Sequence, residues 1–179
     1  EWHRISLAIL ASGGNPRAIG DDRNGDGRGD IDLIADGTYN RVDENGVGIA
    51  GKQGINGFIW ALIAVDSMFY EIPDGAYYSR DDFIRNLLER QLADGGWALS
   101  GESSDADITA MAIQALAPYY NSEKEYTYKN VAQSADDSGI VTKKARTAVD
   151  EAVAWMSETQ LADGDFNSYR TGNRCAHFA

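Results

Sequence analysis

The sequence has very little cysteine, few basic residues and no long apolar run, and each shortage excludes a class of protein. The single cysteine, Cys175, rules out an intrachain disulfide and a zinc cluster built on cysteines. Lys and Arg number 16 against 28 Asp and Glu, and the resulting net charge of −12 opposes binding to nucleic acid or to an anionic membrane surface. No apolar stretch approaches the roughly 20 residues that a membrane span needs. We therefore expect a folded acidic protein with no nucleic-acid partner and no membrane insertion.

One short stretch of the sequence occurs twice. "QLADGGW" at 91–97 returns as "QLADGDF" at 160–166, which is 69 residues later. A second register appears in three apolar segments that start at His3, Asn56 and Asp107 and align with offsets of 53 and 51 residues. Self-similarity of this kind is typical of repeat architectures, and it indicates about three units of one pattern.

The apolar periodicity predicts helices of two kinds. Residues 57–65 and 108–117 are apolar on nearly every side, which is typical of helices buried all round. Residues 80–92 and 143–160 carry one apolar stripe each, which is typical of helices that cover a core from outside. Strand signals are weak throughout. The sequence therefore predicts an all-α fold, an α/α toroid or a partial ring of inner and outer helices.

The predicted organisation is one domain over residues 1–179, with two long connections. Residues 20–54 form a long acidic loop rich in Gly and Asp, and residues 119–139 form a polar insertion. A fourth inner helix is expected to begin near Ala176, so we expect the domain to be truncated at its C-terminus. The N-caps predicted for the two outer helices are Ser79 and Thr142.

The repeated stretch has a local physical interpretation. A helix ends, a glycine takes the left-handed conformation, an aromatic ring folds back, and a Gln side chain satisfies backbone groups at the helix end. The pattern Gln-x-x-x-Gly-x-Trp/Phe between an outer and an inner helix resembles the repeat of the terpenoid cyclase and protein prenyltransferase superfamily (prenyltransferase/squalene-oxidase repeat). The residues that carry it are Gln91, Gly95, Trp97, Gln160, Gly164 and Phe166.

The amino-acid sequences of the repeats are most similar to a branch of that superfamily found in secreted or surface proteins of Gram-positive gut bacteria. The resemblance implies an α/α toroid, an extracellular or cell-surface location, and other extracellular modules of the same parent chain as partners.

Asp105 and Asp107 have three interpretations: a general acid with its neighbour, a cap of the following helix, or a polar contact to a ligand at the mouth of the inner helix ring. The stretch "DADITA" is similar to the Asp-x-Asp-Asp-Thr-Ala signature of the squalene-hopene type of cyclase, which implies that Asp107 is a general acid beside Asp105. The last Asp of that signature is replaced by Ile108. The alternative is that Asp107 caps the helix that follows, with Ser103, Ser104 and Asp105 assisting. The prenyltransferase zinc site is not favoured, because His3 and His177 are at opposite ends of the chain and Cys175 lies in the terminal stretch.

The acidic loop contains a possible calcium motif. Asp22, Asn24 and Asp26 stand at alternate positions before Gly27, a spacing that can wrap a calcium ion, and Asp30 continues the oxygen series. The bidentate Glu of an EF-hand is absent, so the alternative is a solvated acidic turn.

Two functions follow from these patterns. The favoured one is a non-catalytic binding or scaffold module of a secreted or cell-surface bacterial protein, whose ligand (a corrinoid, a glycan or a peptide) lies at the mouth of the inner helix ring. The other is a cyclase-like enzyme with Asp107 as general acid. The residues expected to contact the ligand are Asn56, Trp60, Trp97, Asp105 and Asp107.

Overall fold

The computed structural model describes residues 2–167, and these divide into two compact units. The first, called here the N-terminal unit, holds residues 2–53 and 57–83, and the C-terminal unit holds residues 54–56 and 84–167.

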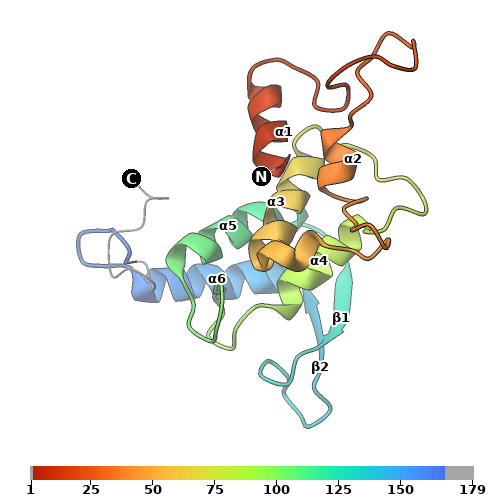
Figure 1. Ribbon diagram of the computed structural model, residues 1–179. Helices are drawn as coiled ribbons and strands as arrows, with labels where there is room; N and C mark the ends of the chain where they lie inside the picture. The colour runs from red at the N-terminus through yellow and green to blue at the C-terminus, as the bar shows by residue number, and fades with distance from the viewer. Residues whose placement is uncertain (1, 168–179) are drawn as a thin grey trace. The chain divides into compact units, whose positions relative to one another are not determined.

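The N-terminal unit is helical. Its helices α1 and α2 pack against each other, and Gly37 permits their contact because a Cβ there would lie 3.1 Å from Trp2 Cβ (Figure 1). Asp32 caps α2 by accepting from the backbone amides of Ile34 and Ala35. The elements of this part of the chain are α1 (Trp2–Ala11), α2 (Leu33–Gly37), the 3-10 helix η1 (Ala50–Gln53) and α3 (Ile55–Asp66), which begins in the C-terminal unit.

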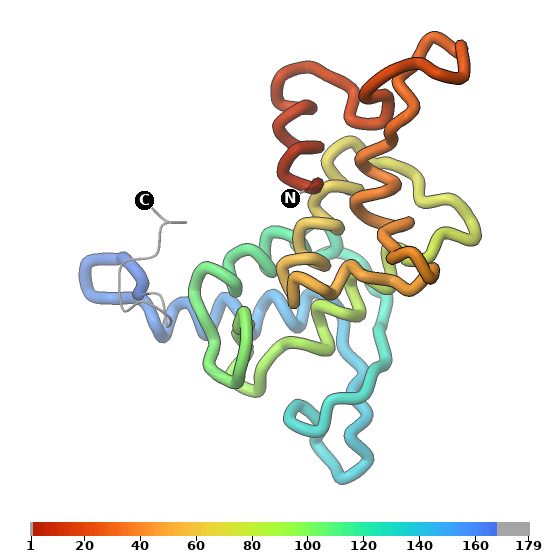
Figure 2. Tube along the Cα trace, in the orientation of Figure 1, coloured from red at the N-terminus to blue at the C-terminus, as the bar shows by residue number. Residues whose placement is uncertain are grey.

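The C-terminal unit combines helices with a β-hairpin. Its strands pair antiparallel, and the second leads directly into α6, which packs on α5 (Figures 1 and 2). The elements are α4 (Arg80–Glu89, whose first turn belongs to the N-terminal unit), α5 (Ala106–Leu116), the 3-10 helix η2 (Ala117–Tyr119), β1 (Glu125–Lys129), β2 (Ile140–Lys144) and α6 (Ala145–Thr159).

The prediction of an all-α toroid is wrong, because the described residues form six α-helices and a two-stranded antiparallel sheet. The hairpin lies within and just after the segment expected to be a polar insertion. Tyr126 and Tyr128 are buried on one side of β1 while their neighbours are exposed, and Tyr128 pairs with buried Val141 of β2. Alternation with a period of two, combined with aromatic and β-branched residues, stabilises a strand where overall polarity had suggested a loop.

The helix starts agree with the sequence in one case and differ in another. Ser79 and Asp82 form a reciprocal cap, in which the backbone N–H and Oγ of Ser79 donate to Asp82 and the Asp82 amide donates to Ser79 Oγ. Thr142, expected to cap the second outer helix, lies in β2 instead, and α6 starts after Lys144 without a side-chain cap.

A buried histidine makes the N-terminal unit sensitive to acid. His3 is 6% exposed, and its Nε2 has no hydrogen-bond partner among residues 2–167. Burial lowers the pKa of His3 from 6.5 to about 4, and the positive charge of Arg41 acts in the same direction. In the unfolded chain the same imidazole is protonated below pH 6.5.

We therefore predict that His3 weakens the fold as pH falls from 6.5 to about 4. In that window the unfolded state binds one proton more, so stability decreases with decreasing pH. The free energy of unfolding of the natural chain, relative to that of His3→Asn, should fall by roughly 3 kcal/mol between neutral pH and pH 4. Urea denaturation of both chains across this range measures the difference, and a difference that does not change with pH would contradict the assignment.

Candidate functional site

The first of the two repeated stretches forms a turn after α4, and residues 91–97 are called here the first turn. Inside it, the Leu92 amide donates to Gly96 O at 2.9 Å and the Gly95 amide donates to Leu92 O at 3.0 Å. Gln91 Nε2 donates to Gly95 O at 2.7 Å, so the Gln side chain closes the turn. Gly95 has a φ of +94°, in the left-handed region that favours glycine.

The same Gln side chain connects the first turn to α6. Its Nε2 also donates to Ala148 O at 2.8 Å, and its Oε1 accepts from Lys143 Nζ at 3.1 Å. Gln91 is 1% exposed, so these bonds satisfy an amide that water does not reach. Gly95 permits the approach of the helix, because a Cβ there would lie 2.8 Å from the backbone oxygen of Glu151.

Trp97 ends the first turn inside the core. It is 0% exposed, and its indole Nε1 donates to Leu87 O at 2.8 Å. Its backbone amide donates to Thr109 Oγ1 at 2.9 Å, so the residue joins the end of α4 to α5. The structure therefore places Trp97 where its ring is enclosed by protein rather than open to a ligand.

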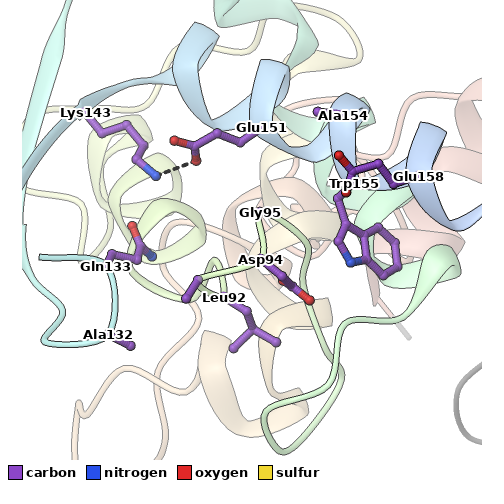
Figure 3. A pocket seen from close by; sticks show the side chains of 11 residues that line it. Leu92, Asp94, Gly95, Ala132, Gln133, Lys143, Glu151, Ala154, Trp155 and Glu158 are labelled. Carbon is purple, nitrogen blue, oxygen red and sulfur yellow. Dashed lines mark hydrogen bonds and ion pairs between the residues drawn. The ribbon is translucent and has the colours of Figure 1, made fainter. Parts of the chain in front are cut away.

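A cavity of about 350 Å³ opens between the first turn, α6 and the start of the hairpin loop (Figure 3). At one end, Lys143 Nζ pairs with Glu151 Oε2 at 2.6 Å. At the other end, the partly buried ring of Trp155 lies near Glu158 and Asp94. We call this cavity the Trp155 pocket, and it brings together helix residues and turn residues that are far apart in the sequence.

The Trp155 pocket has an excess of negative charge. Three carboxylates, those of Asp94, Glu151 and Glu158, line it together with one ammonium group, that of Lys143. Lys143 is already paired, whereas Glu158 has no hydrogen-bond or ion-pair partner among residues 2–167. Asp94 accepts from the Gly96 amide and from a serine hydroxyl, which hold its carboxylate in place. The pocket thus presents an aromatic ring beside a carboxylate that has no partner.

The second repeated stretch, residues 160–166, forms a turn after α6 and is called here the second turn. The Leu161 amide donates to Asp165 O at 2.9 Å, and the Gly164 amide donates to Leu161 O at 2.8 Å. Gln160 Nε2 donates to Gly164 O at 2.7 Å. Phe166 is buried in a cluster with Ala106, against which Trp155 and Met156 pack.

The structure assigns the helix cap to Asp105 rather than to Asp107. Asp105 is the N-cap of α5, and its Oδ1 accepts from the amides of Asp107 and Ile108 at 3.0 and 3.2 Å. Asp107 stands within the first helical turn, and its Oδ1 is buried without a hydrogen-bond partner among the described residues. The two carboxylates therefore have different roles. That of Asp105 accepts hydrogen bonds from the backbone, whereas that of Asp107 accepts none from the described residues.

The remaining predicted ligand residues lie in different units. Asn56 belongs to the C-terminal unit, and its Oδ1 is buried with no hydrogen-bond partner in the part of the chain that the structure describes. Trp60 belongs to the N-terminal unit, where the guanidinium of Arg4 lies 5.5 Å from its ring centroid.

The acidic loop directs its oxygens to its own backbone. Asp22 accepts from the amides of Gly25, Asp26 and Gly27, and Asp30 accepts from the amide of Arg23. Asn24 Oδ1 accepts from the Asp26 amide, and Asp26 Oδ1 from the Arg28 amide. Within residues 2–167, no group of three or more His, Cys, Asp or Glu side chains could hold a metal ion. Cys175 and His177 lie outside the described residues.

Sequence reasoning missed the pocket and a third relative of the turn. Glu151, Trp155 and Glu158 stand at i, i+4 and i+7, so they share one face of α6, and this mixed acidic and aromatic stripe was a readable signal. The stretch "LIADGTY" at 33–39 also resembles the two turns, although Leu33 replaces the Gln.

Comparison with family models finds no match, and neither a curated protein nor a solved structure matches the chain. The resemblance to the terpenoid cyclase and prenyltransferase superfamily therefore stays a prediction. Among the described residues, no helix combines the length and the apolar character that crossing a membrane requires.

We predict that Asp105 stabilises the fold more than Asp107 does. Asp105→Ala removes the acceptor for two helix amides and should lower the free energy of unfolding by about 1–2 kcal/mol. Asp107→Ala removes a favourable charge near the helix N-terminus but also an unpartnered buried oxygen, so its effect should stay within about 0.5 kcal/mol. Urea denaturation measures both, and Asp105→Asn, which keeps the capping oxygen, is the matched control. Equal losses in the two alanine variants would refute this division.

Proposed function

We propose that the chain is a non-catalytic binding module that takes a positively charged group, such as a basic side chain of a peptide, in the Trp155 pocket. The single observation that carries the proposal is the aromatic ring of Trp155 beside the unpartnered carboxylate of Glu158. An aromatic face attracts a cation, and a carboxylate next to it adds both charge and a hydrogen-bond acceptor.

The electrostatics of the pocket and of the whole chain favour the same kind of ligand. The pocket carries three carboxylates against one ammonium group that is already paired, and the net charge of the chain is −12. A cationic ligand would be attracted over a distance and held locally, whereas an anion would be repelled on both scales. This argument favours a peptide over the glycan and the corrinoid, because neither of those needs an acidic site.

A binding role also accords with what surrounds the pocket. Trp155 is fixed by packing against the Ala106 and Phe166 cluster, and Lys143 and Glu151 are fixed by their ion pair. A pocket formed by groups held in place before the ligand arrives binds with little ordering cost. The proposal also includes an extracellular or cell-surface location and membership of the terpenoid cyclase superfamily. The amino-acid sequences of the repeats alone support these two points.

We predict that the chain binds a tri-lysine peptide and that the Trp155 pocket is responsible. Trp155→Leu keeps an apolar side chain for the neighbouring cluster but removes the aromatic face, and should weaken binding about threefold to thirtyfold. Glu158→Gln should weaken it as well, and added salt should weaken binding to the natural chain. Calorimetric titration gives the dissociation constants.

The control for charge is Glu102→Gln, which removes an exposed carboxylate that does not line the pocket. It should leave the affinity for tri-lysine nearly unchanged. Binding that is insensitive to Trp155 and Glu158, or equally sensitive to Glu102, would show diffuse attraction to an acidic surface and would reject the pocket.

One observation favours a second candidate function, a cyclase-like enzyme with Asp107 as general acid and Asp105 beside it. Asp107 Oδ1 is buried and has no hydrogen-bond partner among residues 2–167, so the group is not fully used by the fold. We would incubate the chain with a polyprenyl substrate and analyse products by mass spectrometry. A product that Asp107→Asn abolishes would establish this function in place of the binding module, and no product over background would eliminate it.

A further inference from the structure

The two turns are built alike but differ in what covers them. Both have a Gln side chain bonded to a glycine carbonyl at 2.7 Å, and both have that glycine in the left-handed region. In the first turn, Gln91 and Gly95 are buried because the start of α6 lies on them. In the second turn, Gln160 and Gly164 are exposed.

The exposed turn keeps the groups that bind a helix in the buried one. Gln91 makes one hydrogen bond to α6 and one to β2. Its Nε2 donates to Ala148 O, and its Oε1 accepts from Lys143 Nζ. Gln160 makes neither equivalent bond with any residue between 2 and 167. Among residues 2–167, a Cβ placed on Gly164 would have only Gln160 Nε2 within 4 Å, whereas in the first turn Glu151 occupies the corresponding position.

The second turn is anchored to the core by the ring of its last residue, Phe166. Phe166 is 7% exposed and packs with Ala106 of α5, while Trp155 and Met156 of α6 pack on the same cluster. The exposed edge therefore rests on the core of the C-terminal unit, and its hydrogen-bonding groups are positioned before a partner arrives.

We propose that the second turn is a docking site for an α-helix of a partner chain, bound in the way that the first turn binds α6. The first turn defines the chemistry of that helix: a lysine just before it starts, a small residue one turn in, and a glutamate three residues later. In this chain these are Lys143, Ala148 and Glu151. The small residue lets the backbones approach, Gln160 donates to its carbonyl, and the lysine donates to Gln160 Oε1.

The site is distinct from the Trp155 pocket and does not depend on the proposed function. The pocket is lined by residues of the first turn, whereas the docking site is made by Gln160 and Gly164. Failure of either proposal therefore leaves the other intact.

The probe is a peptide with the sequence of residues 143–159, stapled between positions 146 and 150 so that it is helical before it binds. Those positions are exposed in α6, away from the face that carries Ala148. Calorimetric titration into the full chain should show binding that Gln160→Ala weakens about tenfold, because two hydrogen bonds are lost. Circular dichroism shows whether that variant keeps its fold, and a peptide with Ala148→Leu is the matched control, expected to bind at least tenfold more weakly.

Nuclear magnetic resonance locates the site independently of any variant. The side-chain amide of Gln160 and the backbone amide of Gly164 should shift as peptide is added, and those of Gln91 and Gly95 should not. The proposal is overturned if these signals stay unchanged at millimolar peptide, or if Gln160→Ala or the leucine peptide binds as well as its parent. Self-association of the chain alone, lost in Gln160→Ala, would place a second copy on the turn and would also overturn it.

Discussion

The C-terminal unit depends on one buried side-chain amide, that of Gln91. Its Nε2 bridges Gly95 O in the first turn and Ala148 O in α6, and its Oε1 accepts from Lys143. The first turn is thus joined to β2 and α6, which lie far along the sequence, by a group that water does not reach, so every lost bond would leave a buried polar atom unsatisfied at a cost of about 1–3 kcal/mol. No apolar residue of the same size could supply this connection, because the atoms to be satisfied are backbone carbonyls.

The Trp155 pocket follows from this connection, although Gln91 does not line it. Once Gln91 fixes the start of α6, the helical period brings Glu151, Trp155 and Glu158 to the side that faces the first turn. The hairpin strengthens the arrangement through Gln133, whose Nε2 donates to Gln91 O while its Oε1 accepts from the Tyr128 hydroxyl. Burial, with the nearby charges of Glu151 and Glu89, raises the pKa of Tyr128, so the hydroxyl stays a donor. The carboxylates and the Trp155 ring of the pocket therefore lie on elements that are joined by a hydrogen-bond network, and the side chains of this network have partners themselves.

Local chemistry decided which parts of this protein could be predicted. Helices α3 and α5 occur where apolar runs predicted them, and the left-handed Gly95 was readable because few other residues adopt that conformation. The hairpin was not predicted because its alternation lies inside a polar stretch. The cap was assigned to Asp107 instead of Asp105 because, by residue type, the two nearby aspartates are equally good hydrogen-bond acceptors. The pocket needed the tertiary contact between α6 and the first turn, and no local pattern specifies a bond from residue 91 to residue 148.

The stretch at 33–39 resembles the two turns but lacks their Gln, and it does not form the same turn. It keeps the Ala-Asp-Gly sequence and ends in buried Tyr39, yet it forms helix α2 through Gly37, whose φ lies outside the left-handed region. Leu33 stands where the turns have Gln, so no side-chain amide is available to hold the carbonyl that the turn exposes. In the first turn, the side-chain amide of Gln91 that closes the turn also binds the helix that follows, α6. In both turns of this chain the Gln side chain has bonding capacity left after the turn has formed: α6 uses it at Gln91, and at Gln160 no described residue does.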